Sequence, residues 1–366
     1  MTEAEAPGLA LDDVALSYTR GGPSAVAGVT LDVGEGEVVC LLGPSGCGKT
    51  SCLRLAAGLE RPDRGRVLVG GRVVADAADG RFVAPEKRRV GLVLQDFALF
   101  PHLTVADNLA FGIARLPADE RRARVAALLD QVALAHKAEA FPHELSGGEQ
   151  QRVALARALA PEPDVMLMDE PFSSLDVTLR AEVRAATLAV LARRRVPTLI
   201  VTHDPEEAMA LADRLVVMRA GRVVQSGTPE AVYGHPANEF VMTFLGRTNT
   251  LICPVENGAT RTPFGTVALP PAMAAGSPPS HCRVMIRGGD LRPALGDRSD
   301  GVPARVVDVR LVGPVQQVTL ALPDGAGDAM MEVDRRLRVS PGETLAVAAE
   351  PGSLRCFPMD ETAEPA

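Results

Sequence analysis

The sequence lacks three features that would point to common classes of protein: an excess of basic residues, paired cysteines and a long apolar run. It carries 38 lysines and arginines against 46 aspartates and glutamates, a formal charge of −8. This acidic balance argues against nucleic acid as the main partner, which would favour a basic surface. None of the six cysteines forms a C-x-x-C pair in this long chain, so neither a disulfide framework nor a zinc site is indicated, and we expect reduced thiols in a cytoplasmic protein.

The absence of an apolar run excludes a membrane span from the expected architecture. No stretch approaches the roughly 18 apolar residues that a spanning helix requires. The acidic start, MTEAEAPGLALDD, also differs from a signal peptide, which has a basic region followed by an apolar one. We therefore expect any membrane role to depend on a partner protein.

What the sequence does contain is enough apolar material for large cores, since hydrophobic residues make up 46% and charged residues 23% of the 366 residues. Up to about residue 246, strand-like runs alternate with helical patterns, which favours a parallel α/β sheet. The expected buried strands are 37–43, 164–170 and 197–203, and the expected helices include 52–60, 124–135 and 179–194.

The sequence pattern changes near residue 247, where short strand-like segments separated by glycine and proline begin. Segments 282–287, 304–312, 316–322 and 343–350 predict a small all-β domain, a barrel, with a loop at 270–280. The expected domains are 1–246 and 247–366.

The stretch GPSGCGKT at 43–50 predicts a phosphate-binding loop. It follows an expected strand and precedes an expected helix, which is the context that the G-x-x-x-x-G-K-[ST] motif requires. Glycines in the loop let backbone amides surround a phosphate chain, and the helix start adds positive charge. Lys49 is expected to reach the β- and γ-phosphates, and the Thr50 hydroxyl to ligate Mg²⁺. The alternative is a glycine-rich turn that binds nothing.

Two acidic residues end the expected strand at 164–170. Ligands of open α/β sheets lie at the carboxyl ends of strands. Asp169 therefore suits Mg²⁺ coordination, and Glu170 suits polarisation of an attacking water. Without the phosphate loop, the same residues would indicate only a solvated acidic turn.

A second glycine pair, in LSGGEQQRVALARALA at 145–160, opens another expected helix without a second lysine. Ser146 and Glu149 have the spacing of a capping box. Gly147 and Gly148 are poor helix formers, but they suit a helix start that an anion approaches closely. The simpler interpretation is a well-capped amphipathic helix.

At this point LSGGEQ at 145–150 resembles the signature motif of ABC-transporter ATPases, and the resemblance extends in order over about 1–245. Tyr18 lies where such proteins stack an aromatic ring on adenine, and Gln95 in VLQD fits the Q-loop. SSLD at 173–176 resembles the D-loop, with Ser174 where alanine is usual, and His203 in VTHD fits the H-loop that contacts the γ-phosphate.

The resemblance implies a RecA-like mixed sheet with a helical subdomain at about 97–160, and ATP and Mg²⁺ as cofactors. It implies catalytic roles for Glu170, His203, Gln95 and Lys49, and Mg²⁺ ligation by Thr50, Gln95 and Asp169. The implied ATP-binding residues are Tyr18, Gly43, Pro44, Ser45, Gly46, Cys47, Gly48, Lys49, Thr50 and Ser51. In this family the signature of one subunit closes over the partner's ATP, so the residues implied to act in trans are Ser146, Gly147, Gly148, Glu149 and Asp176.

The C-terminal segments 284–293, 342–350 and 354–358 resemble the TOBE barrel that follows the cassette in importers of ions, sugars and polyamines. The resemblance implies a homodimer beneath two membrane permease subunits, at the cytoplasmic face of the membrane, with a separate periplasmic or extracellular solute-binding protein. The expected roles of the domain are dimer stabilisation and regulation, with a purely structural appendage as the alternative.

Other members of the superfamily fit less well. Exporters usually carry fused membrane helices, translation and resistance factors carry two cassettes, and the stretch between Thr50 and Leu145 is too short for the long coiled coils of DNA-repair relatives. A P-loop kinase or a soluble ABC ATPase outside transport is therefore the weaker alternative.

The cargo is not read by the cassette itself. The stretch 82–112 and the short C-terminal domain resemble ferric-iron importer ATPases most, and polyamine, sulfate/thiosulfate, molybdate, thiamine and sugar import are the alternatives. The apolar stretch 96–112, together with the helical region to 144, is expected to hold the permease's cytoplasmic helix.

Overall fold

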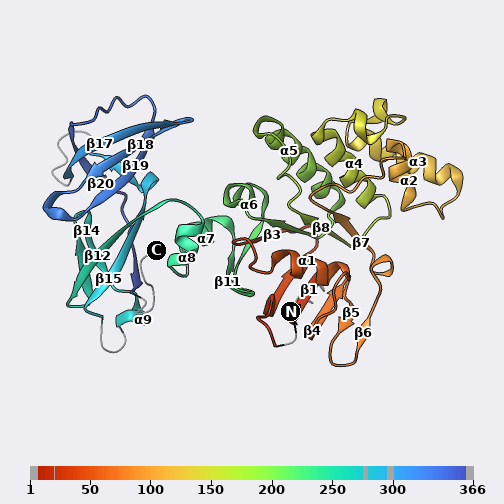
Figure 1. Cartoon of the computed structure of the whole chain (residues 1–366), viewed down its shortest axis with the longest axis horizontal. Coiled ribbons are helices and arrows are strands. Elements are labelled where there is room, and N and C mark those ends of the chain that lie inside the picture. The colour runs from red at the N-terminus through yellow and green to blue at the C-terminus, as the bar shows by residue number, and fades with distance from the viewer. Residues whose placement is uncertain (1–6, 20, 275–278, 295–300, 360–366) are drawn as a thin grey trace, which may run out of the picture. The chain divides into compact units, whose positions relative to one another are not determined.

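The computed structural model describes residues 7–19, 21–274, 279–294 and 301–359. The chain divides into two compact units, Met1–His235 and Pro236–Ala366, and each is described by itself. Figure 1 shows the elements of both units. Among the described residues, no helix is long and apolar enough to span a membrane. All six cysteines are free and buried.

The first unit is built on a six-stranded mixed sheet, which confirms the expected α/β fold. Its strand order is β11-β10-β3-β9-β8-β7, with β11 antiparallel and the rest parallel. The strands are β3 (Val38–Leu42), β7 (Val90–Val93), β8 (Val165–Asp169), β9 (Thr198–Thr202), β10 (Arg214–Arg219) and β11 (Arg222–Gly227). Every residue of β3 and β9 is buried, as expected of parallel strands covered on both faces.

A second, antiparallel sheet packs over the first helix. Its strand order is β2-β1-β4-β5-β6, comprising β1 (Leu9–Leu16), β2 (Val26–Val33), β4 (Arg64–Val69), β5 (Arg72–Asp76) and β6 (Arg81–Phe82). Helix α1 (Lys49–Ala57) contributes Cys52, Leu53 and Leu55 to a core that also contains side chains from both sheets. This burial fixes the direction of α1 and hence of the loop before it.

The remaining helices of this unit follow the sheet strands or form a separate cluster. They are α2 (Val105–Phe111), α3 (Ala118–Gln131), α4 (Gly147–Leu159), α5 (Val177–Arg194), α6 (Pro205–Leu211) and α7 (Pro229–Gly234), with 3₁₀ turns at Pro85–Lys87, Ala135–Lys137 and Pro142–Glu144. Helix α4 contacts α2, α3, α5 and strand β7. It therefore connects the helical cluster to the sheet (Figure 1).

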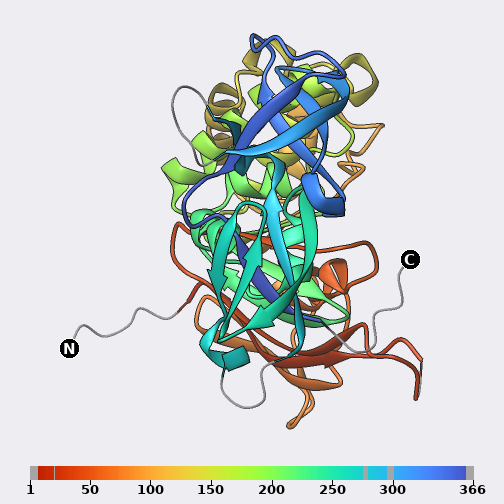
Figure 2. The same ribbon diagram turned by 90° about the vertical axis from the view of Figure 1, so that its left-hand side faces the viewer.

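The second unit confirms the expected small all-β domain, and Figure 2 shows its strands facing the viewer. Two five-stranded sheets, β14-β13-β12-β15-β21 and β16-β20-β17-β18-β19, share one hydrophobic core. The strands are β12 (Thr248–Glu256), β13 (Ala259–Thr262), β14 (Gly265–Ala268), β15 (His281–Arg287), β16 (Leu291–Pro293), β17 (Val302–Val312), β18 (Val315–Ala321), β19 (Asp328–Asp334), β20 (Thr344–Ala349) and β21 (Arg355–Pro358).

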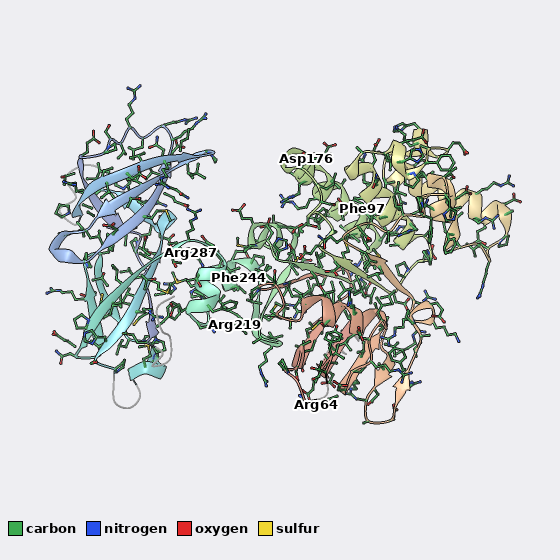
Figure 3. All side chains as sticks on the ribbon, viewed as in Figure 1. Arg64, Phe97, Asp176, Arg219, Phe244 and Arg287 are labelled. Atoms are coloured by element: carbon green, nitrogen blue, oxygen red, sulfur yellow. The ribbon has the colours of Figure 1, made fainter. Side chains whose placement is uncertain are left out.

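One helix of this unit precedes its first strand. Helix α8 (Glu239–Phe244) is tied to β15, because Arg283 forms an ion pair with Glu239 and the buried Arg287 donates to the Met242 carbonyl at 3.1 Å (Figure 3). These contacts explain why the compact unit begins at Pro236.

The stretch 270–280 was expected to be a loop throughout, and that prediction was wrong in part. Pro271–Ala274 form a short helix, α9. Proline is well suited to the first turn of a helix, since it needs no amide hydrogen there and its fixed φ is already helical. Residues 275–278 lie outside the described part of the chain.

Candidate functional site

The loop between β3 and α1 brings bare backbone amides to the carboxyl edge of the main sheet. Gly48 caps α1 with φ 104°, a left-handed conformation that favours glycine, and the cap has no side-chain hydrogen bond. No side chain caps the amides at the start of α1, which is compatible with the expected phosphate site. A Cβ on Gly48 would lie 2.1 Å from the Ala25 carbonyl oxygen, so no other residue fits this position without a shift.

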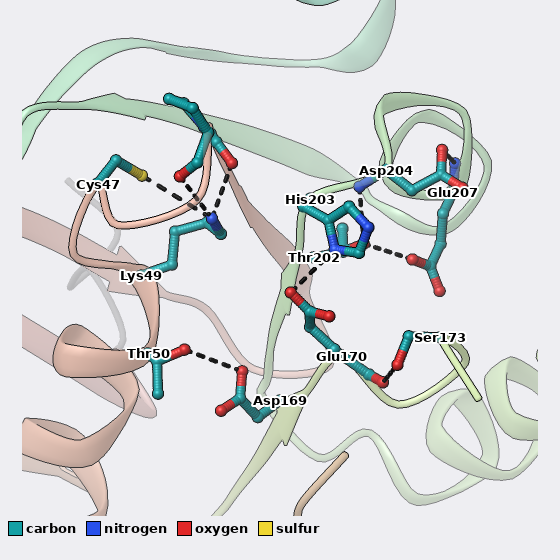
Figure 4. Close-up of polar contacts among 12 residues, drawn as sticks. Cys47, Lys49, Thr50, Asp169, Glu170, Ser173, Thr202, His203, Asp204 and Glu207 are labelled. Carbon is teal, nitrogen blue, oxygen red and sulfur yellow. Dashed lines mark hydrogen bonds and ion pairs between the residues drawn. The ribbon is translucent and has the colours of Figure 1, made fainter.

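Lys49 is buried and its ammonium group is turned toward its own loop. Its Nζ donates to the carbonyl oxygens of Gly43 at 2.7 Å and Pro44 at 3.0 Å, and lies 3.9 Å from the Cys47 Sγ (Figure 4). Carbonyl oxygens thus take the place that phosphate oxygens are expected to occupy. Cys47, within the loop, is buried, and burial raises the pKa of its thiol although Lys49 acts in the opposite direction.

Thr50 and Asp169 meet across the sheet edge although 119 residues separate them. The Thr50 hydroxyl donates to Asp169 Oδ1 at 3.3 Å. Burial raises the pKa of the Asp169 carboxyl, against the hydrogen bond from Thr50, and the neighbouring Glu170 raises it further. An oxygen pair of this kind, with a carboxylate short of solvation, is suited to a hard divalent cation such as Mg²⁺.

Glu170 and His203 meet at the ends of the adjacent strands β8 and β9. His203 Nδ1 lies 2.9 Å from Glu170 Oε1 (Figure 4). Glu170 has φ 45°, and its carbonyl oxygen accepts hydrogen bonds from the Ser173 hydroxyl at 2.9 Å and the Ser173 amide at 3.3 Å. The backbone is thus held in an uncommon conformation that points a carboxylate toward the site.

Two predicted ATP-site residues lie at its periphery. The pairing of Val93 with Met168 places Gln95, two residues beyond Val93, at the same sheet edge as Asp169 and Glu170. The exposed Tyr18 ring is linked to α1, because its hydroxyl lies 3.1 Å from the Ser51 hydroxyl.

The expected capping box at the start of α4 is confirmed. The Ser146 hydroxyl accepts from the Glu149 amide at 3.4 Å, while Glu149 Oε2 accepts from the Ser146 amide at 2.8 Å and from its hydroxyl at 2.9 Å. The backbone hydrogen bond from Ser146 lowers the pKa of Glu149, so this carboxylate stays charged at the helix start.

The two signature glycines have different environments. Gly147 is exposed, whereas Gly148 is buried, and a Cβ on Gly148 would lie 2.7 Å from Leu179 and 2.9 Å from Val183. Close packing of α4 on α5 therefore requires a glycine at 148, a reason that the sequence interpretation missed. Asp176 caps α5 by accepting from the Leu179 amide at 2.9 Å, and Figure 3 shows it at the start of that helix.

Sequence reasoning also missed residues that support the site from beneath. The Thr202 hydroxyl, one residue before His203, donates to the buried Glu207 carboxyl. Arg180 donates to the Leu175 carbonyl in the D-loop at 3.0 Å and lies 3.7 Å from Asp204, which caps α6. Arg157 donates to the backbone that follows Gln95. The sequence offered one signal for these supporting residues, since each is a charged residue on an otherwise apolar helix face. Their partners could not be predicted, because they are remote in sequence.

Family models match both parts of the chain. An ABC transporter model matches residues 26–173, and a TOBE domain model matches residues 284–357. The sulfate/thiosulfate import ATP-binding protein CysA of Thermosynechococcus vestitus is 40% identical over 96% of this chain and 98% of its own length. This chain belongs to the ABC transporter ATPases. Members of the family couple ATP hydrolysis to transport.

Other relatives agree on the family and differ in cargo. The Fe(3+) ions import ATP-binding protein FbpC 1 of Rhodococcus jostii is 45% identical over 83% of this ABC ATPase and 85% of its own chain. Among solved structures, the dimeric post-hydrolysis state of the ATP-binding cassette MJ0796 with ADP and Pi has a TM-score of 0.52 and 30% identity. The match covers 60% of this chain and 98% of that one.

Proposed function

We propose that this ABC ATPase energises the import of an inorganic ion, with ferric iron as the first candidate. The observation that carries the ATPase role is the convergence of Lys49, Thr50, Asp169, Glu170 and His203 from three segments on one sheet edge (Figure 4). Import is supported by relatives over nearly the whole chain whose names describe import ATP-binding proteins. The chain itself would not touch the cargo.

The proposed roles follow the positions of the groups. ATP binds along Tyr18, the loop 43–51 and the start of α1, and Lys49 exchanges its loop carbonyls for phosphate oxygens. Thr50 and Asp169, with Gln95 at the same edge, would hold Mg²⁺, which neutralises charge on the phosphates when bound. The half-buried Thr50–Asp169 oxygen pair fits such an ion.

We assign to Glu170 the activation of an attacking water. Its carboxylate accepts a proton or polarises the water as general base, and His203 holds the carboxylate through the 2.9 Å contact and faces the γ-phosphate. Water activation at this position yields hydrolysis rather than transfer to a second substrate.

We further propose that two chains form a homodimer in which the signature of one completes the nucleotide site of the other. Ser146, Gly147, Gly148, Glu149 and Asp176 would act in trans. The dimeric state of a cassette related by 30% identity supports this arrangement. Two membrane permease subunits and an external solute-binding protein complete the proposed importer, with this chain at the cytoplasmic face of the membrane and the TOBE domain stabilising and regulating the dimer.

The proposed permease contact is the segment 96–112 with the helical region that follows it to 144. The Phe111 side chain is 60% exposed, and its ring lies 4.4 Å from that of Phe100, centroid to centroid. An exposed phenylalanine that packs on a half-buried one suits contact with an apolar helix of a partner.

Uptake in a gene-deletion strain tests the cargo. Labelled ferric iron, sulfate and putrescine uptake are measured in parallel, with complementation by wild type or by Glu170→Gln. Selective loss of iron uptake that only wild type restores supports the first candidate. Selective loss of sulfate uptake supports the second, which the sulfate/thiosulfate import relatives favour at comparable identity. If the strain complemented with wild type and the strain complemented with Glu170→Gln took up iron, sulfate and putrescine equally, the result would count against the proposal.

A further inference from the structure

The segment after Gln95 has an unusual backbone. Phe97 and Ala98 have φ 60° and 44°, two consecutive non-glycine residues in the left-handed region. The turn keeps local hydrogen bonds from the Phe97 amide to the Leu94 carbonyl at 2.9 Å and from the Ala98 amide to the Asp96 carbonyl at 2.7 Å. Side chains with a Cβ disfavour this conformation, so further contacts must hold it.

One side chain supplies those contacts. Arg157 Nη1 donates to the Ala98 carbonyl at 2.7 Å, and Nη2 donates to the Phe97 carbonyl at 2.9 Å. The same guanidinium lies over the Phe100 ring, with Cζ 5.2 Å from the ring centroid. The planar fork of an arginine matches two neighbouring carbonyls in a way that a lysine cannot. Phe97, labelled in Figure 3, is itself buried, which adds packing to these hydrogen bonds.

The Arg157 contact joins two segments to which the proposed function assigns roles. Arg157 lies on α4, the helix that begins with the Ser146–Glu149 capping box. Its two acceptors lie two and three residues after Gln95, and Phe100 belongs to the proposed permease contact. A single guanidinium thus links the signature helix to the first residues of the proposed permease contact, directly after the proposed Mg²⁺ ligand Gln95.

We propose that Arg157 is a positioning residue that fixes the Phe97–Ala98 turn and thereby couples the signature helix to Gln95. It touches neither nucleotide nor cargo, and its effect passes through the backbone of the turn. The inference rests on the role proposed above for Gln95. A movement of α4 would move the turn as well, because the two hydrogen bonds and the ring contact restrict independent motion of the turn.

The test is a mutant cycle on the purified full-length chain, with the rate of ATP hydrolysis as readout. Arg157→Gln is expected to lower kcat roughly tenfold or more, since small misplacements near a reacting centre are costly. The KM for ATP should stay within about twofold, because uniform ATP binding does not depend on the turn. Arg157→Lys should fall between Arg157→Gln and wild type.

Rescue distinguishes positioning from mere packing. Ala98 is exposed, and glycine adopts φ 44° without strain, so Ala98→Gly should restore at least about threefold of the kcat that Arg157→Gln loses. Ala133→Gly is the matched control, an exposed alanine with φ 56° elsewhere in the helical region, and it should restore nothing. Thermal melts verify that each variant is folded.

The outcomes distinguish the positioning role of Arg157 from the proposed role of Gln95 as a Mg²⁺ ligand. An unchanged kcat in both Arg157 variants, or equal rescue by Ala98→Gly and Ala133→Gly, would overturn the positioning role. A Gln95→Ala variant measured in parallel tests the other assumption. Unchanged hydrolysis in that variant would count against Gln95 as a Mg²⁺ ligand, while the Arg157–Ala98 cycle would still report whether the turn is clamped.

Discussion

His203 Nδ1 lies 2.9 Å from Glu170 Oε1, between the ends of two strands that are neighbours in the sheet but are separated by helix α5 in the chain. The contact holds the carboxylate that we propose as general base.

Glu170→Gln should therefore lower the rate of ATP hydrolysis by roughly 10²–10⁴-fold, the usual contribution of a general base. ATP binding should persist, because the amide keeps the shape of the side chain. Phosphate release and equilibrium ATP binding measure the two effects, and Glu206→Gln, an exposed carboxylate on α6, serves as control. Loss of binding together with hydrolysis would show that Glu170 has a structural role instead.

Glu149→Gln should strengthen the ATP-dependent dimer. If the signature faces the partner's γ-phosphate, the charged Glu149 carboxylate repels it, and the amide removes that repulsion while retaining an acceptor for the Ser146 amide. A several-fold lower dissociation constant is expected, since charge pairs near a surface contribute only about 1 kcal/mol. Sedimentation with ATP in the Glu170→Gln background measures it. A dimer unchanged at low and high salt would argue that Glu149 lies away from the nucleotide.

Alanine substitutions at the two signature glycines should have different effects, one on the free energy of unfolding and the other on ATP-dependent dimerisation. Gly148→Ala places a Cβ 2.7 Å from Leu179 and should cost about 1–3 kcal/mol of unfolding free energy, as overpacking does. Gly147→Ala meets only Leu175, at 3.4 Å, and should leave stability within about 1 kcal/mol, the usual glycine-to-alanine range in helices. If Gly147 contacts the partner's ATP, its variant should still lose ATP-dependent dimerisation. Chemical denaturation and sedimentation compare the pair, and equal destabilisation would contradict the packing account.

Glu207→Gln should change how stability depends on pH. Burial raises the pKa of Glu207 above its ordinary value of 4.5, Asp204 raises it further, and Thr202, Arg180 and Arg184 oppose the shift. The folded state therefore binds this proton more tightly than the unfolded state, and ionising the group costs stability as pH rises from about 4.5 through the folded pKa.

The glutamine variant avoids that cost. Its Tm should match wild type at the acidic end and exceed it increasingly toward neutral pH, by roughly 2–4 °C for each kcal/mol. Thermal melts across this pH range test the sign, with Glu206→Gln as the exposed control. A variant that is less stable than wild type at every pH would show that the charged carboxylate stabilises the fold.

The sequence by itself determined the parts of this protein whose chemistry is local. The role proposed for the loop 43–50 depends on its own backbone amides and the helix that it begins, so eight consecutive residues were enough to predict it. The Ser146–Glu149 capping box is likewise closed within one turn of helix. The change near residue 247 to short strand-like segments separated by glycine and proline marks the second domain. The order of the motifs indicated the family, and the roles of Tyr18, Gln95 and His203 follow from the family as predictions.

Only the tertiary structure decided which remote groups support those motifs. Arg157 finds the Phe97 and Ala98 carbonyls because α4 packs beside the end of β7, and Glu207 finds Thr202 because α6 turns back onto the strand before it. Gly148 is required by Leu179 and Val183 on helix α5, which strand β8 separates from α4 in the chain. Such contacts depend on the distances between packed elements, which no residue pattern within a single segment contains.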